Sequence, residues 1–139
     1  MKNVKTKDLR EPAEQGNVEA QYQLGERYFY GRKGVRKNKK IAESWIRKSA
    51  EQGHADAQYL LGAYYIHGWG VIDSDASEAA KWLRKSAEQG HAEAQYSLGL
   101  YYSSGMGGTE GKSEAMKWYR KAAEQGHADA IEGLAKHHK

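Results

Sequence analysis

The tetrapeptide Ala-Glu-Gln-Gly occurs four times in this chain, ending at Gly16, Gly53, Gly90 and Gly126. The sequence therefore repeats after 37, 37 and then 36 residues. A unit of this length is typical of a pair of helices, which cannot bury its apolar face alone and must stack on similar units. The pattern predicts an all-α solenoid that forms a single domain. We divide the chain into a half unit at 1–12, full repeats at 13–49, 50–86 and 87–122, and a terminal half repeat at 123–139.

Each unit is expected to hold a first helix, A, and a second helix, B, which in the second unit cover residues 54–67 and 75–89. In helix A, Ala57, Leu61 and Tyr65 follow each other at intervals of four, so they form one stripe on the helix surface. The same residue types recur in the units before and after. We expect this stripe to be buried. Three A–B pairs and a terminal helix A give an expectation of seven helices.

Two further positions recur for reasons of local geometry. Gly62 lies in mid-helix, where glycine costs about 1 kcal/mol relative to alanine, so its recurrence predicts the close approach of a neighbouring helix. His54, His91 and His127 each follow a turn glycine at the start of a helix A. Neighbouring helices lie roughly 10 Å apart, which is too far for these imidazoles to share one metal ion. We expect the histidines to cap helices or to form loop hydrogen bonds.

The recurring pattern Ala-x-Ala-Gln-Tyr-x-Leu-Gly-x-x-Tyr-x-x-Gly, followed by Asp-x-x-x-Ala-x-x-Trp-x-Arg-Lys-Ser-Ala-Glu-Gln-Gly, resembles the Sel-one-like repeat. This repeat is a relative of the tetratricopeptide repeat, and the resemblance covers residues 13–139. It implies an α/α superhelical solenoid of helix-turn-helix repeats in which the A helices line the concave surface. It also implies a function as an adaptor, an assembly scaffold, or a bacterial host-interaction or signalling factor.

A second face of helix A, at positions i, i+4 and i+7, changes its chemistry from unit to unit. The resemblance places this face in the concave groove, and its aromatic residues favour partner binding because rigid aromatics are common interface anchors. The alternative is an unconstrained solvent face. The leading hypothesis is a non-enzymatic protein–protein interaction module that holds a peptide or a protein in this groove. The candidate binding residues are Gln23, Arg27, Tyr30, Leu60, Tyr64, His67, Ser97, Tyr101 and Ser104.

A basic segment accounts for much of the formal net charge of +4. We expect it to lie in the loop between the two helices of the first unit, either solvated or steering an acidic partner toward the protein. No aromatic residues are interleaved with these charges, so sequence-specific nucleic-acid binding is not expected. The residues assigned to steering are Arg36, Lys37, Lys39 and Lys40.

Catalytic and metal motifs are missing from the sequence, so we expect no enzyme activity, no cofactor and no metal. There is no cysteine, no Ser-x-x-Lys, no Gly-x-Ser-x-Gly and no His-Glu-x-x-His. The Gly111-Lys112-Ser113 segment fails as a phosphate-binding loop because Met106 replaces the required glycine. A β-lactamase-like enzyme is therefore disfavoured, whereas an immunity protein that neutralises a toxin stays open as an alternative.

Apolar segments are short. The longest, residues 59–66, cannot span a bilayer, and residues 1–12 lack the apolar stretch of a secretory signal. The sequence thus predicts a cytoplasmic protein, without membrane insertion, that acts as a monomer.

Overall fold

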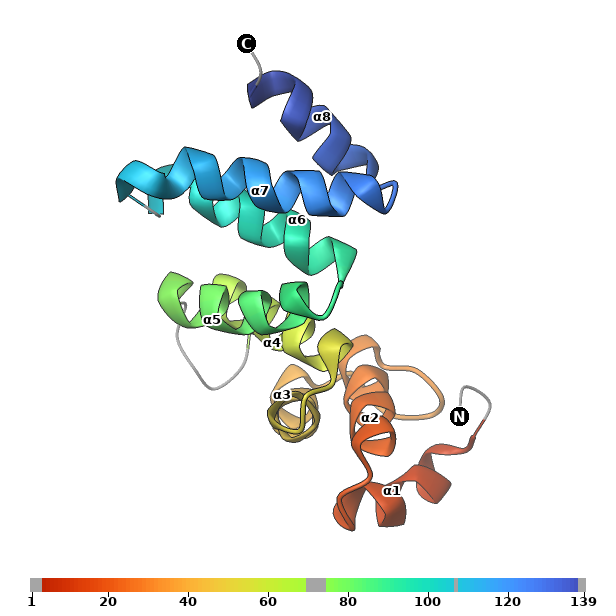
Figure 1. Ribbon diagram of the computed structural model, residues 1–139. Helices are drawn as coiled ribbons and strands as arrows, with labels where there is room; N and C mark the ends of the chain where they lie inside the picture. Colours follow the sequence, from red (N-terminus) through yellow and green to blue (C-terminus); the bar gives the residue numbers. More distant parts are fainter. Residues whose placement is uncertain (1–3, 70–74, 107, 138–139) are drawn as a thin grey trace.

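The computed structural model describes residues 4–69, 75–106 and 108–137, and within these ranges the chain forms eight α-helices and no strand. Each helix packs on the helix before it and the helix after it, and Figure 1 shows the resulting stack from α1 to α8. The described residues thus confirm the expected all-α solenoid. The helices are α1 (Thr6–Glu14), α2 (Val18–Tyr30), α3 (Lys39–Glu51), α4 (Ala55–His67), α5 (Ala76–Glu88), α6 (Ala92–Tyr101), α7 (Gly111–Glu124) and α8 (Ala128–His137), with the short segments η1 (Tyr102–Met106) and η2 (Gly108–Glu110) before α7.

The prediction of seven helices is wrong by one, because the half unit at the beginning of the chain also folds. Its residues form α1, which packs on α2 as a B-type helix. Leu9 and Ala13 of α1 are each 1% exposed and share a core cluster with Ala20 and Leu24 of α2. Leu9 precedes Ile46 by one period of 37 residues, so this short helix buries the same apolar position as the complete B helix α3.

The predicted packing stripe of helix A is confirmed. Ala57 and Leu61 are fully buried, and Tyr65 is 9% exposed. The recurrent mid-helix glycine also has the expected cause: a Cβ atom at Gly62 would lie 2.9 Å from Leu83 of α5. Cβ atoms at the corresponding glycines of α2 and α6 would come within 2.7 Å of Ile46 and 2.6 Å of Tyr119. The B helix of each unit can pack this closely against helix A only because the glycine has no Cβ atom.

The helix ends follow local rules. The glycines of the four Ala-Glu-Gln-Gly segments have φ between 86° and 100°, the left-handed region that glycine adopts at low cost. At the start of the B helices α3 and α5, the side chains of Asn38 and Asp75 accept hydrogen bonds from the backbone N–H groups of Ile41 and Glu78. In α7, Gly111 takes the corresponding place, where a Cβ atom would lie 2.7 Å from the carbonyl oxygen of Tyr102. The glycine that resembled part of a phosphate-binding loop is thus a packing residue.

Polar side chains join the A and B helices of each unit at repeated positions. The hydroxyls of Ser49 and Ser86 donate to the carbonyl oxygens of Val18 and Ala55, over 3.0 and 2.8 Å. Near the ends of the same B helices, glutamine side chains donate to glutamines of the A helices. These pairs are Gln52 to Gln21 at 2.8 Å, Gln89 to Gln58 at 2.8 Å, and Gln125 to Gln95 at 3.0 Å.

Candidate functional site

The A helices α4, α6 and α8 each begin at a histidine that is fixed by two hydrogen bonds. The Nδ1 atom of His54 accepts from the backbone N–H of Ala57 at 3.1 Å, and His91 and His127 cap their helices in the same way. The predicted capping role is therefore confirmed. Because Nδ1 accepts a hydrogen bond, the ring carries its proton on Nε2, the atom that faces the preceding unit.

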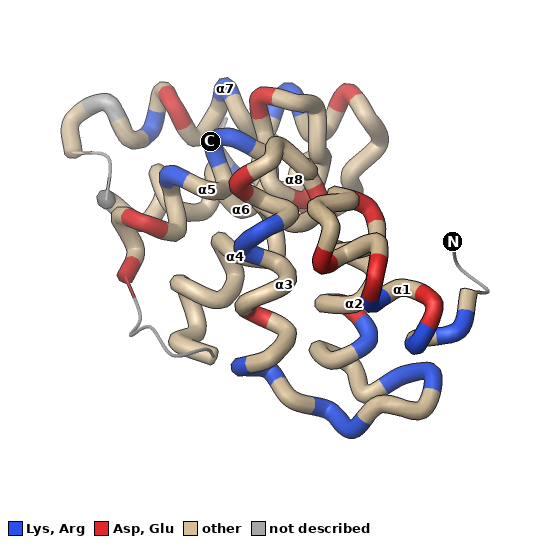
Figure 2. The backbone as a smooth tube through the Cα atoms, turned by 90° about the horizontal axis from the view of Figure 1, so that it is seen from below, with Lys and Arg blue, Asp and Glu red and all other residues tan. Residues whose placement is uncertain are grey.

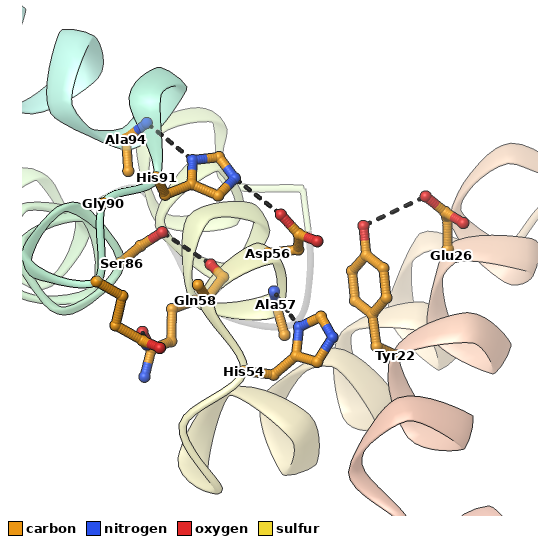
Figure 3. A network of polar contacts seen from close by, with 12 residues as sticks. Tyr22, Glu26, His54, Asp56, Ala57, Gln58, Ser86, Gly90, His91 and Ala94 are labelled. Carbon is orange, nitrogen blue, oxygen red and sulfur yellow. Dashed lines mark hydrogen bonds and ion pairs between the residues drawn. The ribbon is translucent and has the colours of Figure 1, made fainter. Parts of the chain in front are cut away.

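This Nε2 atom contacts a carboxylate in the first turn of the preceding A helix. The distances are 2.9 Å for His54 to Glu19, 2.9 Å for His91 to Asp56, and 2.6 Å for His127 to Glu93. Each imidazole ring also stacks on a tyrosine of that preceding helix, as Figure 3 shows for His54 and Tyr22. The ring centroids are 4.5 Å apart for Tyr22–His54, 4.9 Å for Tyr59–His91 and 4.7 Å for Tyr96–His127. A tyrosine, a histidine and a carboxylate therefore meet at each junction between A helices.

These contacts change the protonation equilibria of the groups on this face. Burial, together with the nearby Glu26 carboxylate, raises the pKa of Tyr22, and burial also raises the pKa of Tyr59. Both side chains therefore remain neutral phenols near neutral pH. The pKa of Glu19 is lowered, first by a hydrogen bond from Gln23, against the effect of partial burial, and further by His54. Glu19 is accordingly ionised over the neutral range.

Two adjoining cavities lie along this face of the A helices. The first, here called the acidic cavity, has a volume of about 250 Å³, and its lining includes Glu26, Asp56 and Glu93 together with Tyr22, Tyr30 and Tyr59. The second, called the outer cavity, measures about 560 Å³ and adds Glu19, Gln23, Arg27, Arg32 and Lys33. Tyr22, Glu26 and Asp56 line both, so the two form one continuous groove over α2 and α4.

A third cavity, called the apolar cavity, opens between α4, α5 and α6. It measures about 470 Å³ and is lined by Ala79 and Leu83 at its base. Ile66 and Leu100 lie at its rim with exposed fractions of 43% and 45%, which is high for large aliphatic side chains. The cavity thus offers an apolar surface held between three packed helices.

The predicted binding residues are divided among these three cavities. Tyr30 and Leu60 line the acidic cavity, and Gln23 and Arg27 line the outer cavity. The four remaining residues that line a cavity gather in the apolar cavity: His67, Ser97, Tyr101 and Ser104. The variable face of the A helices therefore includes recessed surface in every unit.

Two of these residues are buried, although we expected them to be exposed. Tyr64 is completely buried, and its hydroxyl donates to the carbonyl oxygen of Lys39 at 2.6 Å. Arg27, one repeat earlier, is 4% exposed and donates to Thr6 at 3.1 Å. The physical reason is that an A helix packs against the B helix before it as well as the one after it, so its buried surface is wider than one stripe. Tyr64 is a core residue, not a groove residue.

The basic segment extends from the loop after α2 into α3, and Figure 2 shows it at one edge of the molecule. Arg36 and Lys37 are exposed in the loop, as expected. Lys39 and Lys40, however, belong to the first turn of α3, which corrects their predicted place in the loop. The Lys39 ammonium lies 4.4 Å from the centre of the Trp69 ring and is half-buried, so this residue is part of the packing.

The acidic cavity was missed by the sequence analysis. The sequence analysis gave no functional role to Asp56, Glu93 or Tyr59. The sequence signal that links these residues across a unit boundary is their spacing: Asp56 precedes His91 by 35 residues and Glu93 precedes His127 by 34, a change of one that follows the shorter third period. Among the described residues, no group of three or more His, Asp or Glu side chains could hold a metal ion. None of the helices in this part of the chain has both the length and the apolar character needed to cross a membrane.

Comparisons with known proteins agree with this architecture. The family model described as Sel1 repeat matches residues 18–54, 55–91 and 92–127. The crystal structure of a Sel1 repeat protein from Oxalobacter formigenes is similar with 37% sequence identity and a TM-score of 0.82, over 93% of this chain and 96% of that one. That of c5321, a protective antigen present in uropathogenic Escherichia coli strains and displaying an SLR fold, has 34% identity and a TM-score of 0.82. This match covers 93% of the chain but spans only 27% of c5321. A search of curated proteins found no match.

Proposed function

The chain belongs to the Sel1 repeat family, and from this premise we propose that it is a non-enzymatic module that binds a protein, or a peptide segment of one, on the face formed by α2, α4 and α6. Sel1 repeat proteins generally mediate protein–protein interactions. The observation that carries the proposal is the apolar cavity, where Ile66 and Leu100 expose aliphatic surface around a recess held by three helices. Exposed apolar surface around a rigid recess is typical of an interaction site.

The residues in and around this cavity offer a partner different kinds of contact. Tyr101 presents a half-buried ring with a polar end, a combination that suits an interface anchor. Ser97 and Ser104 supply hydroxyls, and the imidazole of His67 stacks on Trp69 with ring centroids 4.4 Å apart. A partner side chain that enters the cavity would therefore bury its apolar part against Leu83 and Leu100 and meet polar groups at the rim.

A pair of matched substitutions tests this proposal. Leu100→Glu places a charge at the rim of the apolar cavity, and Ile131→Glu makes the same kind of change on α8, at a residue that is 52% exposed and lies outside the three cavities. Tagged wild type and both variants are used to capture partners from a lysate of the source cell, with circular dichroism as the folding control. A partner recovered by wild type and Ile131→Glu but not by Leu100→Glu supports the proposal. Equal recovery by all three proteins contradicts it.

The exposed basic residues are proposed to act on the rate of encounter. Arg36, Lys37 and Lys40 are exposed, and exposed charges of this kind attract acidic groups of a partner over a distance that falls with salt. Replacing Lys37 and Lys40 with glutamine is expected to slow association and to flatten its salt dependence, with little change in dissociation. A large increase in the dissociation rate would instead make these lysines part of the contact surface.

A further inference from the structure

We propose that the acidic cavity receives a lysine or arginine side chain of the partner, carried on an extended polypeptide segment that continues into the outer cavity. This inference rests on the proposed function, because it names the chemistry of the partner at the same face of the A helices. It also gives the protein a preference that its net charge of +4 does not suggest.

Acidic side chains surround the acidic cavity. Three carboxylates, those of Glu26, Asp56 and Glu93, line the acidic cavity, and no lysine or arginine does. Their hydrogen-bond donors come from the protein itself: Tyr22 donates to Glu26 at 3.2 Å, while Asp56 and Glu93 accept from histidine Nε2 atoms. The side chains of Asp56 and Glu93 are still 57% and 56% exposed, so they keep oxygen atoms free for a further donor. The cavity therefore has a local excess of negative charge.

Aromatic rings form a further part of the lining of the acidic cavity. Tyr22, Tyr30 and Tyr59 line the same cavity, and the rings of Tyr22 and Tyr59 are held in place by stacking on His54 and His91. A cation beside the face of such a ring is attracted by the electron density of the ring, and more strongly where water is partly excluded. Carboxylates combined with rigid aromatic rings favour a long cationic side chain, whose aliphatic part packs while its charged end is paired.

The adjoining outer cavity gives the partner segment room to continue. Tyr22, Glu26 and Asp56 line both cavities, so a segment whose cationic side chain enters the acidic cavity can extend into the outer cavity. The exposed side chains of Arg32 and Lys33 also line the outer cavity, where they can donate to backbone carbonyl oxygens of an extended segment.

The test uses an end-blocked, unstructured Gly/Ser peptide that carries several lysines, with matched peptides in which glutamine or glutamate replaces every lysine. Binding to the full-length protein is followed by NMR, from backbone amide shifts, at low ionic strength. The lysine peptide is expected to shift amides of α2, α4 and α6 around the acidic cavity, whereas the glutamine and glutamate peptides leave them unchanged. Shifts caused equally by the glutamine peptide, or preferentially by the glutamate peptide, would overturn the proposal.

Matched variants separate the cavity from the total charge. The variant Glu26→Gln, Asp56→Asn and Glu93→Gln removes three charges but keeps a carbonyl oxygen at each hydrogen bond, and it should weaken the lysine peptide by about tenfold or more. The control variant Glu51→Gln, Glu88→Gln and Glu124→Gln removes three charges at the exposed ends of B helices. It should bind as wild type does. Equal weakening in both variants would show a response to net charge and would overturn the assignment.

Further outcomes identify the molecule that occupies the acidic cavity and separate this inference from the proposed function. Spermidine that binds the acidic cavity as tightly as the lysine peptide would assign the cavity to a free polyamine and contradict a polypeptide partner. A lysine peptide that fails to bind, while Leu100→Glu still abolishes partner capture, would refute this inference alone. Binding of the lysine peptide together with a silent Leu100→Glu would support the inference and remove the apolar cavity from the proposed function.

Discussion

The ring of Tyr119 lies between two glycines, and replacing each glycine with alanine is expected to change stability in opposite directions. A Cβ atom at Gly99 of α6 would lie 2.6 Å from one edge of the ring, whereas a Cβ atom at Gly133 of α8 would lie 3.5 Å from the other edge. The first distance is a steric clash and the second is ordinary van der Waals contact. Tyr119 is 2% exposed, and its hydroxyl donates to Ser103 at 3.1 Å, so the ring has little room to move away.

The magnitude follows from two opposing effects. Alanine in place of a helix-interior glycine stabilises by about 0.5–1 kcal/mol, and this gain is common to both positions. Overpacking of a buried site costs about 1–3 kcal/mol, and it applies only at Gly99. Gly133→Ala should therefore raise the free energy of unfolding by about 0.5–1 kcal/mol. Gly99→Ala should be less stable than Gly133→Ala by about 1–3 kcal/mol. The gain in helix propensity does not enter this difference, because it is the same in both variants.

Urea unfolding followed by circular dichroism measures these free energies. A double variant, Gly99→Ala with Tyr119→Ala, identifies the cause: once the ring is absent, alanine at position 99 should stabilise relative to Tyr119→Ala alone. Two single variants that differ by less than about 0.5 kcal/mol, the usual scale of surface substitutions, would refute the explanation that glycine recurs to admit the neighbouring helix.

Four further predictions concern single residues. Leu61→Ala should lower the free energy of unfolding by about 2–5 kcal/mol in urea titrations, because it leaves a cavity at a fully buried site. Tyr64→Ala should cost about 3–5 kcal/mol for the same reason, and a variant as stable as wild type would restore Tyr64 to the groove. His54→Asn should lower stability less than His54→Ala, since both variants lose the contacts with Glu19 and Tyr22 but asparagine can keep the cap, as Asn17 does for α2; the lost cap should cost His54→Ala about 0.5–2 kcal/mol more. Glu19 has a lowered pKa, so its stabilising contribution is complete above the unfolded pKa of about 4.3 and is lost as the pH falls through the folded pKa. In thermal unfolding from pH 7 to pH 3, Glu19→Gln should therefore lose less stability than wild type does.

The fold could be predicted from the sequence because equivalent positions of successive repeats can be compared within one chain. A position that holds leucine or glycine in three units, such as Leu61 or Gly62, faces the equivalent position of the adjacent helix in each unit. The helix starts at the histidines were equally accessible, because the capping side chain of His54 lies within four residues of the backbone group that it satisfies. These features depend on local geometry or on a nearest neighbour, and both are visible in a period of 37 residues.

The site could be predicted only in part. Leu60 and Tyr101 were chosen as members of one helix face, which can be derived from spacing alone, and both line cavities; their role in binding stays a prediction. Tyr64 was misplaced because spacing does not reveal that α4 is covered from two sides, by α3 and by α5. The acidic cavity was missed because Asp56 and Glu93 lie on successive helices, and their convergence depends on how far each unit rotates relative to the last. That rotation is not encoded in any single position.

The serine and glutamine bonds between A and B helices have a consequence for how such a chain can change over generations. In the first two units each of these bonds joins residues 31 positions apart, from glutamine to glutamine or from serine to a backbone carbonyl oxygen. Each bond thus lies inside one A–B pair. Genetic duplication of a whole unit would copy the pair with its bonds intact, while the residues at the cavities could diverge afterwards without disturbing them. The length of the protein and the chemistry of its surface are therefore free to evolve separately.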